Sequence, residues 1–405
     1  MTNLSRWHNV TSALISADSF IDFSWYFTVG TYLSRRVYMG DFERGLFPNL
    51  FVVCVGLAGI GKSLAVSETL KLISSISDDS AQPIRLKNGL TEKPPLIKVC
   101  ADTTNFSAIV EAMSRAVRNE RRIVKGKPFP YIFTPFSFVQ DELSALIREK
   151  EGGQIVKMLL KLYDCETYTY QTRMHQEERI HSPFSSLLCS TTPSFLTDAH
   201  KLGLFADGFS SRVCWLFEGR PRRYVARLEA YSEEQLKDKD LLKQRLKAIS
   251  KLSGRVVETE AVVKFVDEYY FSKVVPQLEL SAGPMRDYFA RKMTHIHKLA
   301  MCIHFSDSDD MTLTIDDYKQ AISLLESMEP KMRIGLSLIG RNSLAGIANN
   351  VYDFIKNHGR TGVPLAGVLT QFHTEVTMRE MSEILDVLMA LDRISFSEQK
   401  YRAKV

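Results

Sequence analysis

The sequence predicts an α/β protein: a mostly parallel sheet with helices on both faces, then a helical region and a small C-terminal module. Three observations support this. Between residues 50 and 217, apolar runs of strand length alternate with amphipathic stretches of helical spacing. A glycine-rich turn, "GLAGIGKS", joins the first of these runs to a helical stretch. Residues 343–405 read as three short helices followed by a basic, β-prone tail.

The bulk composition is that of an ordinary globular chain. Of its 405 residues, 45% are hydrophobic and 24% are charged, and the formal net charge is +5. This charge permits a polyanionic partner without requiring one. No apolar run approaches the roughly 20 residues that span a bilayer, and the N-terminus lacks a basic start followed by an apolar core. We therefore expect a cytoplasmic protein without a membrane partner.

The expected elements follow in order along the chain. Residues 1–45 form a helical segment with a Gly- and Pro-punctuated exit. Five buried strands then alternate with helices, which indicates a parallel sheet that is covered on both faces. These strands are "LFVVCVG", "PLIKVCAD", "FSFVQDE", "SSLLCSTTP" and "SRVCWLF".

The second half of the chain is predominantly helical in pattern. Residues 219–255 are charged and helix-prone, as a solvated helical face is, and helical periodicity continues over 258–338. The order of elements in 343–405 is typical of a winged-helix module. The six cysteines contain no C-x-x-C pair, and most lie in apolar runs, so we expect buried reduced thiols.

The glycine-rich turn carries the first chemical signal. Its residues fit G-x-x-x-x-G-K-S, and a strand precedes it while a helix follows. Glycines let the backbone wrap phosphates, Lys62 reaches the β- and γ-phosphates, and Ser63 can hold Mg²⁺. The sequence therefore predicts a site for ATP and Mg²⁺. The residues expected to contact the nucleotide are Gly56, Gly59, Gly61, Lys62, Ser63 and Leu64.

A second signal is the acidic pair that ends the expected strand "FSFVQDE". Asp141 would bind Mg²⁺ through water, and Glu142 would orient and deprotonate an attacking water molecule. The pair also stands where a helix, "ELSALIREK", begins, so an interaction with the helix dipole is an alternative that is compatible with catalysis.

Two further polar positions follow expected strands. Thr191 and Thr192 end "SSLLCSTTP", and either hydroxyl would lie near the γ-phosphate if this strand lies between the phosphate loop and the acidic strand. Threonines before a proline also simply end strands, and that alternative stays open. Arg212 stands just before the last strand, where an arginine can reach a neighbouring subunit's nucleotide and stabilise a transferring phosphoryl group.

This order of parts resembles the AAA+ ATPases over roughly residues 30 to 340. Within them it resembles the branch with a hairpin before the sensor strand, which includes the minichromosome maintenance and viral superfamily-three helicases. The closer likeness is to helicase-like proteins of phages and mobile elements that are fused to or encoded beside primases. It rests on "PNLFVVCVGLAGIGKS", "DELSALI", "LLKLYDCETYTYQTR", "SPFSSLLCSTTP" and "GFSSR".

The resemblance implies a role for each matching residue. Lys62 and Glu142 would be catalytic, and Thr192, or else Thr191, would be the polar sensor, although many relatives have asparagine there. Arg212 would be the arginine finger that acts on another subunit. Arg291, in preference to Arg286, would be the second-sensor arginine, with an ordinary helix-surface position as the alternative for both.

The resemblance also implies a division into four parts. These are an N-terminal helical segment, an AAA+ nucleotide-binding core, a helical lid domain and a winged-helix-like domain. Their expected ranges are 1–45, 46–220, 221–342 and 343–405.

Three segments are candidates for contact with nucleic acid. In "CETYTYQTRMHQEERIHSP" we expect a hairpin whose Arg173 and His175 contact the backbone while Tyr170 stacks, an ordinary surface hairpin being equally open. Lys125 and Lys127 stand in a basic cluster, "SRAVRNERRIVKGKPF". This cluster could form another loop that points, like the hairpin, into the central channel of a ring, but we favour a solvated helix end followed by a turn. The winged-helix module would offer a basic edge formed by Arg379, Arg393, Lys400, Arg402 and Lys404.

The leading hypothesis is an ATP-driven DNA helicase or translocase that forms a ring, most simply a hexamer, in phage or mobile-element replication in a bacterial host. Its substrate would be single-stranded or forked DNA, and a primase or polymerase would be a partner. The alternative is a helicase loader or DNA-bound assembly switch that recruits a partner. The hairpin favours the motor, whereas the small size favours the loader.

Overall fold

The fold comes from a computed structural model that describes residues 1–42, 44–79, 81–85, 91–100, 105–124, 127–147, 151–171, 178–201, 208–227, 229–340, 343–373, 376–390 and 393–404. The chain divides into two compact units, Met1–Leu336 and Ser337–Val405. The finer division into four parts stays a prediction.

The first unit is built on a four-stranded parallel sheet in the order β12-β2-β11-β7. Each strand is apolar and almost completely buried, as expected for strands covered on both faces. Four of the five expected strands and the α/β class are thereby confirmed. The strands are β2 (Phe51–Val55), β7 (Phe138–Gln140), β11 (Leu187–Thr191) and β12 (Cys214–Phe217).

The fifth expected strand, "PLIKVCAD", forms no regular strand among its described residues. It joins the sheet through one parallel bridge between Val99 and Ser137. The Cys100 N–H donates to the Ser137 carbonyl at 2.9 Å, and the Ser137 N–H donates to the Lys98 carbonyl at 3.0 Å. Pro94 and Pro95 lack N–H donors for a ladder, which limits pairing at the start of the segment.

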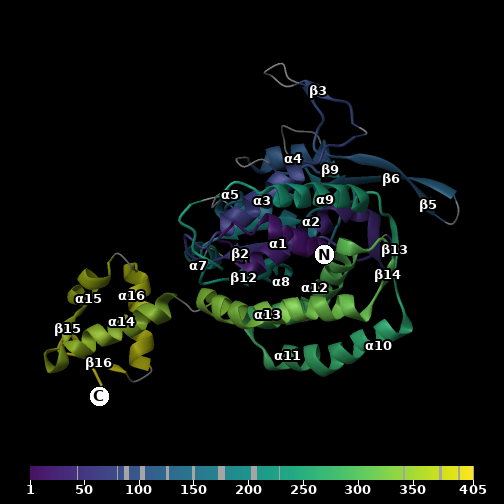
Figure 1. Cartoon of the computed structure of the whole chain (residues 1–405). Helices are drawn as coiled ribbons and strands as arrows, with labels where there is room; N and C mark the ends of the chain where they lie inside the picture. The colour runs from purple at the N-terminus through teal and green to yellow at the C-terminus, as the bar shows by residue number, and fades with distance from the viewer. Residues whose placement is uncertain are drawn as a thin grey trace. The chain divides into compact units, whose positions relative to one another are not determined.

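Helix α2 (Asp18–Leu33) lies inside the first unit. It is apolar all round, as core helices are, and 13 of its 16 residues are buried. It contacts α3 (Lys62–Ser74), α12 (Gly283–Asp307) and β2 (Figure 1). Its Trp25 donates an indole hydrogen bond to Ser306 of α12 at 2.9 Å. The N-terminal segment is helical as predicted, but it belongs to the core.

Two antiparallel hairpins belong to small sheets that are separate from the four-stranded parallel sheet. The first joins β5 (Arg118–Val124) to β6 (Lys127–Pro135), paired from Arg118↔Phe133 to Val124↔Lys127. In Figure 1 it projects from the other elements of its unit. The favoured expectation here, a helix end and a turn, is wrong beyond α4 (Phe106–Ser114), because runs of β-prone residues flank the Lys-Gly-Lys-Pro turn and pair with each other.

The second hairpin joins β8 (Tyr168–Tyr170) to β9 (Glu178–Ile180), with Tyr168 paired to Ile180. It lies between α6 (Gly152–Tyr163) and β11 in the chain, so the hairpin predicted for this segment is confirmed. Its tip, residues 172–177, lies outside the described part of the chain.

The helical half contains one element that differs from expectation. Helix α9 (Glu233–Ile249) begins with a capping box of Ser232 and Gln235. The sequence predicted a solvated face, yet its Leu242, Leu246 and Ile249 are buried and it contacts α1 (Asn3–Val10) and α2. A small parallel sheet, β1-β13-β14, also ties the N-terminal segment to this half.

The other elements of the first unit complete the list of bounds. They are η1 (Ser34–Arg36), β1 (Val37–Met39), β3 (Ile84–Arg85), β4 (Thr91–Glu92), α5 (Leu143–Leu146), β10 (Pro183–Phe184), α7 (Pro193–Lys201), α8 (Phe209–Arg212), β13 (Gly254–Glu258), α10 (Glu260–Tyr269), the π-helical η2 (Tyr270–Val274), α11 (Val275–Leu280), β14 (Thr312–Leu313) and α13 (Ile315–Gly340). Among the described helices of the chain, none has the length and apolar character needed to cross a membrane.

The second unit has its own apolar core. The predicted three helices and β-prone tail are confirmed, and a short strand between the first two helices adds a third strand to the sheet β15-β17-β16. The turn between the last two strands has two residues with positive φ, Glu398 and Gln399. The elements are α14 (Ser343–Asn357), η3 (Gly359–Thr361), β15 (Val363–Pro364), α15 (Leu365–Phe372), α16 (Met378–Ala390), β16 (Ile394–Ser397) and β17 (Lys400–Ala403).

Gly30 provides a test of the close packing of α2. A Cβ at this position would lie 2.2 Å from the Pro48 carbonyl oxygen and 3.0 Å from the Cys302 sulfur. Gly30→Ala should therefore lower the free energy of unfolding by about 1–3 kcal/mol, although alanine is normally the better helix former. Gly153→Ala in α6, where a Cβ meets nothing within 4 Å, is the matched control. Equal urea denaturation midpoints for the two variants would contradict this packing.

Candidate functional site

The phosphate loop, residues 56–63, connects β2 to α3. Gly59 and Gly61 adopt φ values of +85° and +79°, a region that L side chains rarely adopt. The Lys62 ammonium donates hydrogen bonds to the carbonyl oxygens of Gly56 and Leu57 at 2.7 and 2.8 Å. Because α3 begins at Lys62, the positive end of its dipole faces this loop.

Neighbouring elements hold the loop at both ends. The Gly56 N–H donates to the carbonyl of Thr191 on β11 at 3.3 Å. At the other end, the Ser16 hydroxyl donates to the Gly61 carbonyl at 2.7 Å. A Cβ at Gly59 would meet nothing within 4 Å, so the middle of the loop is open to a ligand. Ser63 is exposed and Leu64 is half-buried on the first turn of α3.

The acidic pair lies at the same sheet edge as the phosphate loop. Burial lowers the pKa of Lys62, and the carboxylate of Glu142 acts in the opposite direction, so these two side chains are within electrostatic reach. Glu142 precedes only the four-residue α5, and among the described residues its side chain makes no capping hydrogen bond there. The catalytic role of Glu142 and its interaction with the helix dipole both stay predictions. Asp141 is exposed, and its carbonyl accepts a hydrogen bond from Ser190.

The two candidate sensor threonines lie in different places. Thr191 is completely buried at the end of β11, and its hydroxyl donates to Glu142 Oε1 at 3.1 Å. Thr192 instead shares a hydrogen bond with the Ser194 hydroxyl at 2.9 Å and accepts one from the Phe195 N–H at 3.4 Å at the start of α7. The structure brings Thr191, and not the preferred Thr192, to the carboxylate of Glu142.

Arg212 and Arg291 converge on one carboxylate. Arg212, at the end of α8, donates to Asp164 Oδ2 at 2.6 Å, and Arg291 of α12 lies 3.7 Å from Asp164 Oδ1. Asp164 follows the last residue of α6. The sequence placed both arginines in a nucleotide site but gave no signal for Asp164, because no local motif marks it.

A cavity of about 290 Å³ lies beside this ion cluster. Its lining includes Lys298 of α12, which is only 2% exposed. The ammonium donates to Asn49 Oδ1 at 2.5 Å and lies 4.2 Å from the centre of the Tyr163 ring. Burial lowers the pKa of Lys298 to about 8.

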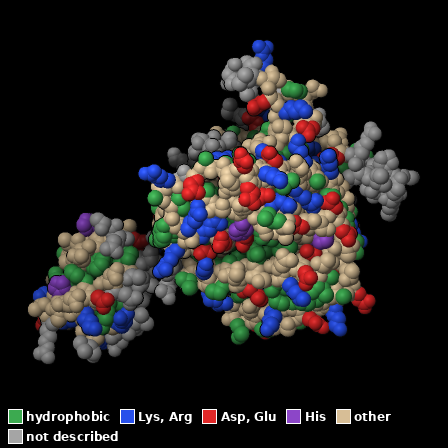
Figure 2. Space-filling view, viewed as in Figure 1, with side chains coloured by type: hydrophobic (Ala, Val, Ile, Leu, Met, Phe, Trp, Pro, Cys, Tyr) green, Lys and Arg blue, Asp and Glu red, His purple; other side chains and the backbone are tan. Residues whose placement is uncertain are grey.

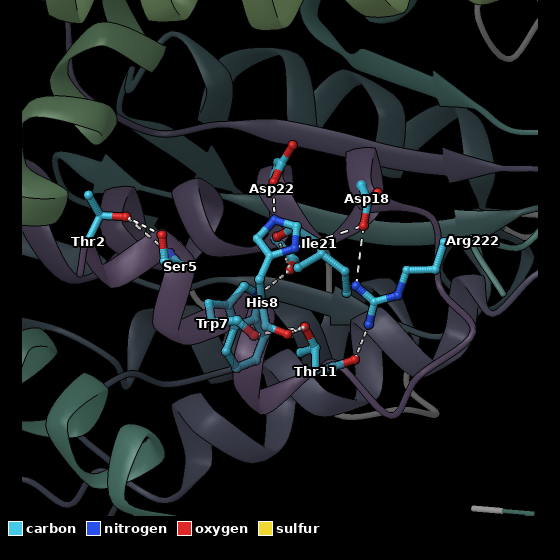
Figure 3. Close-up of polar contacts among 10 residues, drawn as sticks. Thr2, Ser5, Trp7, His8, Thr11, Asp18, Ile21, Asp22 and Arg222 are labelled. Atoms are coloured by element: carbon cyan, nitrogen blue, oxygen red, sulfur yellow. Dashed lines mark hydrogen bonds and ion pairs between the residues drawn. The ribbon is translucent and has the colours of Figure 1, made fainter. Parts of the chain in front are cut away.

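A second pocket, of about 420 Å³, is lined in part by Glu218, whose N–H donates to the Val55 carbonyl at 3.0 Å just before the phosphate loop. It is lined by residues from the start of α2, from the segment after β12 and from α13. Arg222 is one of its lining residues, and Figure 3 shows it donating to Asp18, at 3.3 Å, and to the Thr11 carbonyl, while His8 contacts Asp22 at 2.6 Å. Glu218 accepts hydrogen bonds from Ser19 at 2.8 Å and from Lys331.

The candidate nucleic-acid residues are only partly placed. Arg173, His175 and Lys125 lie outside the described residues, and Lys127 is the first residue of β6. Tyr170 packs edge-on against Phe106 of α4 at 5.1 Å between ring centres, an arrangement that opposes the predicted stacking on a base. Figure 2 shows Lys and Arg interspersed with Asp and Glu over the viewed face of the first unit.

No protein-family model and no curated protein matches this chain.

The low pKa of Lys298 gives a test of its burial. Its folded-state pKa of about 8 lies below the ordinary 10.5, so the unfolded chain binds the extra proton between these values and stability should rise with pH there. Relative to Lys298→Met, we expect the free energy of unfolding of the native chain to rise by on the order of 1–3 kcal/mol from pH 7.5 to 10. Parallel pH profiles in chemical denaturation would contradict an ammonium buried in this cavity.

Proposed function

We propose that the chain is an ATPase of the AAA+ class that assembles into a ring, a hexamer in its simplest form, and moves along DNA. One observation carries the proposal: Lys62, Glu142 and Thr191, from three separate segments, meet at one edge of the parallel sheet. Strand β11 lies between β2 and β7, so its last residue lies beside both the phosphate loop and the acidic pair. This is the placement that water activation next to a γ-phosphate requires.

The roles of the residues follow from their contacts. Lys62 would move from the loop carbonyls to the β- and γ-phosphates of ATP, and the exposed oxygens of Ser63 and Asp141 would hold Mg²⁺. Mg²⁺, when bound, would neutralise charge on the phosphates. Glu142 would accept the proton of the attacking water, and the Thr191 hydroxyl would hold that carboxylate in position.

The pocket next to the phosphate loop supports a nucleoside site. Phe23, Leu216 and Met328 supply apolar surface, and Asp18 and Asp22 supply acceptors for an exocyclic amine. Glu218 lines the pocket, and its carbonyl oxygen lies so close to Gly56 that a Cβ at that position would be only 2.5 Å away. The pocket is therefore next to the start of the phosphate loop. The adenosine of ATP would lie in this pocket.

Arg212 supports a site shared between subunits. Its guanidinium donates to Asp164, which follows α6, and to the Gly208 carbonyl. Among the described residues it makes no hydrogen bond to the phosphate loop. An arginine in this position would act on the nucleotide of another copy, with Arg291 as the second arginine. The helical region 221–342 would serve as the lid, and the second unit as a winged-helix domain.

The hairpin β8–β9 supports a motor. The hairpin precedes β11, the strand that carries Thr191. A change at the γ-phosphate would therefore be passed through this strand to the hairpin. Arg173 and His175, near the tip of the hairpin, would then contact the backbone of single-stranded or forked DNA. A primase or polymerase would be the partner, and the setting would be phage or mobile-element replication in bacterial cytoplasm.

An ATP-dependent loader or DNA-bound assembly switch is the second candidate. Helix α16, which would enter the major groove in a DNA-reading winged-helix domain, exposes Arg379 and Asp386, while Glu380 is half-buried. The carboxylates of Glu380 and Asp386 offset the charge of Arg379, which disfavours contact with DNA phosphates and suits a protein partner.

Steady-state ATP turnover with and without single-stranded DNA tests the proposal. Lys62→Ala should remove turnover, and Glu142→Gln should lower the rate about 10²- to 10⁴-fold while ATP still binds, because only proton transfer is lost. The matched control is Glu268→Gln, an exposed glutamate of α10. Full turnover by Glu142→Gln, or none by the native chain, would overturn the assignment.

A further inference from the structure

The cluster around Asp164 contains more positive than negative charge. Among its described lining residues, the 290 Å³ cavity has three cationic side chains, Arg44, Arg291 and Lys298, and one carboxylate, Asp164. Arg212 adds a fourth cation, because it pairs with the same carboxylate. Arg44 is exposed, but Arg212 and Arg291 are half-buried and Lys298 is buried, and such an excess of cations favours an anion.

Two of these cations lack full compensation among the described residues. Lys298 is 2% exposed, and its ammonium contacts a neutral amide, Asn49, and the ring of Tyr163, while the charge of Asp164 acts on it without a direct ion pair. The Nε atom of Arg212 is buried and has no hydrogen-bond partner in the described part of the chain. Both side chains could gain interactions from an oxyanion.

Asp164 also lies at a strained junction. Cys165, which follows it, adopts φ +56°, an uncommon conformation for a residue other than glycine. Arg35 holds this turn by donating to the Cys165 carbonyl at 2.8 Å. Strand β8 begins at Tyr168, so Asp164 and its ion pairs lie shortly before the hairpin β8–β9 in the chain.

We propose that this cavity is an oxyanion site for the terminal phosphate of a nucleotide held by another copy of the chain, and that Asp164 is the counter-charge that holds Arg212 and Arg291 until this phosphate arrives. The inference rests on the proposed function for its source of phosphate. It assigns Lys298 as a third cation of the site and Asp164 as a positioning residue.

The exchange would link the nucleotide of one subunit to the hairpin of the next. When both arginines turn from the carboxylate to a phosphate, Asp164, which lies shortly before the hairpin in the chain, loses two ion pairs. The junction at Cys165 is then held by fewer contacts, and the hairpin can change its position. No covalent step is involved.

Binding of inorganic phosphate tests the cavity independently of turnover. We would measure it by calorimetry in chains that carry Lys62→Ala, so that the phosphate loop does not contribute. Adding Asp164→Asn removes the competing carboxylate and should tighten binding about tenfold, or about 1.4 kcal/mol. Adding Lys298→Met, or Arg291→Gln if the first variant does not fold, should weaken it at least tenfold.

The exposed α13 lysine in Lys319→Gln controls for overall charge. Equal affinities in Lys319→Gln, Arg291→Gln and Lys298→Met, or no phosphate binding even with Asp164→Asn, would overturn the oxyanion site.

Mixing two inactive chains identifies the source of the phosphate. Lys62→Ala keeps the cavity but lacks a working phosphate loop. Lys298→Met keeps the phosphate loop but lacks the third cation of the cavity. If the phosphate comes from another copy, mixed assemblies should hydrolyse ATP well above the sum of the separate chains. If the mixture shows no recovery of ATP hydrolysis, and Lys298→Met also binds a single-stranded oligonucleotide more weakly, the phosphate in the cavity comes from nucleic acid and not from a nucleotide.

If the native chain hydrolyses no ATP but phosphate binding follows the pattern above, the proposed function fails and the oxyanion site stands.

Discussion

The parallel pairing of β2 with β11 is the constraint on which the candidate site depends. Leu187 to Thr191 pair with Phe51 to Val55, so both strands end at one edge of the sheet. The next hydrogen bond, from the Gly56 N–H to the Thr191 carbonyl, fixes the start of the phosphate loop against β11. Because β7 pairs with the other side of β11, Glu142 comes within reach of both Thr191 and Lys62. A slip in this register would separate all three.

The buried helix α2 also stabilises the phosphate loop and the strands beside it. The helix contacts β2, β11 and α3, and the loop before it places Ser16 on the Gly61 carbonyl. The phosphate loop is thus held by backbone and hydroxyl groups on either side, while Gly59 leaves its middle open. Such a preorganised loop can receive phosphate groups with little rearrangement of the backbone.

The parts of the site that depend on local sequence were predictable, and those that depend on pairing were not. The glycines and Lys62 of the phosphate loop follow from a motif whose spacing dictates the turn. The choice between Thr191 and Thr192 depends on which side of β11 faces Glu142, and the sequence alone does not settle that alternation. Asp164 carries no motif and becomes meaningful only where α6, α8 and α12 meet.

The fold shows the same distinction. Strongly apolar runs predicted four strands correctly, whereas the fifth segment, which begins with a proline, joins the sheet through a single bridge among its described residues. The hairpin β5–β6 was missed because its basic residues suggested a solvated helix end, although its β-prone runs pair along their whole length. Helix α9 was expected in solvent because its charges outnumber its apolar residues, yet one narrow apolar stripe is enough to pack it on α1 and α2.

We propose that ATP hydrolysis at Glu142 drives movement along DNA, and strand displacement from a labelled forked duplex with ATP and Mg²⁺ measures this most directly. We expect the native chain to displace the strand, whereas Glu142→Gln should bind the fork and displace nothing. If the native chain binds the fork and hydrolyses ATP without displacing a strand, the motor is contradicted and the protein is an ATP-dependent switch.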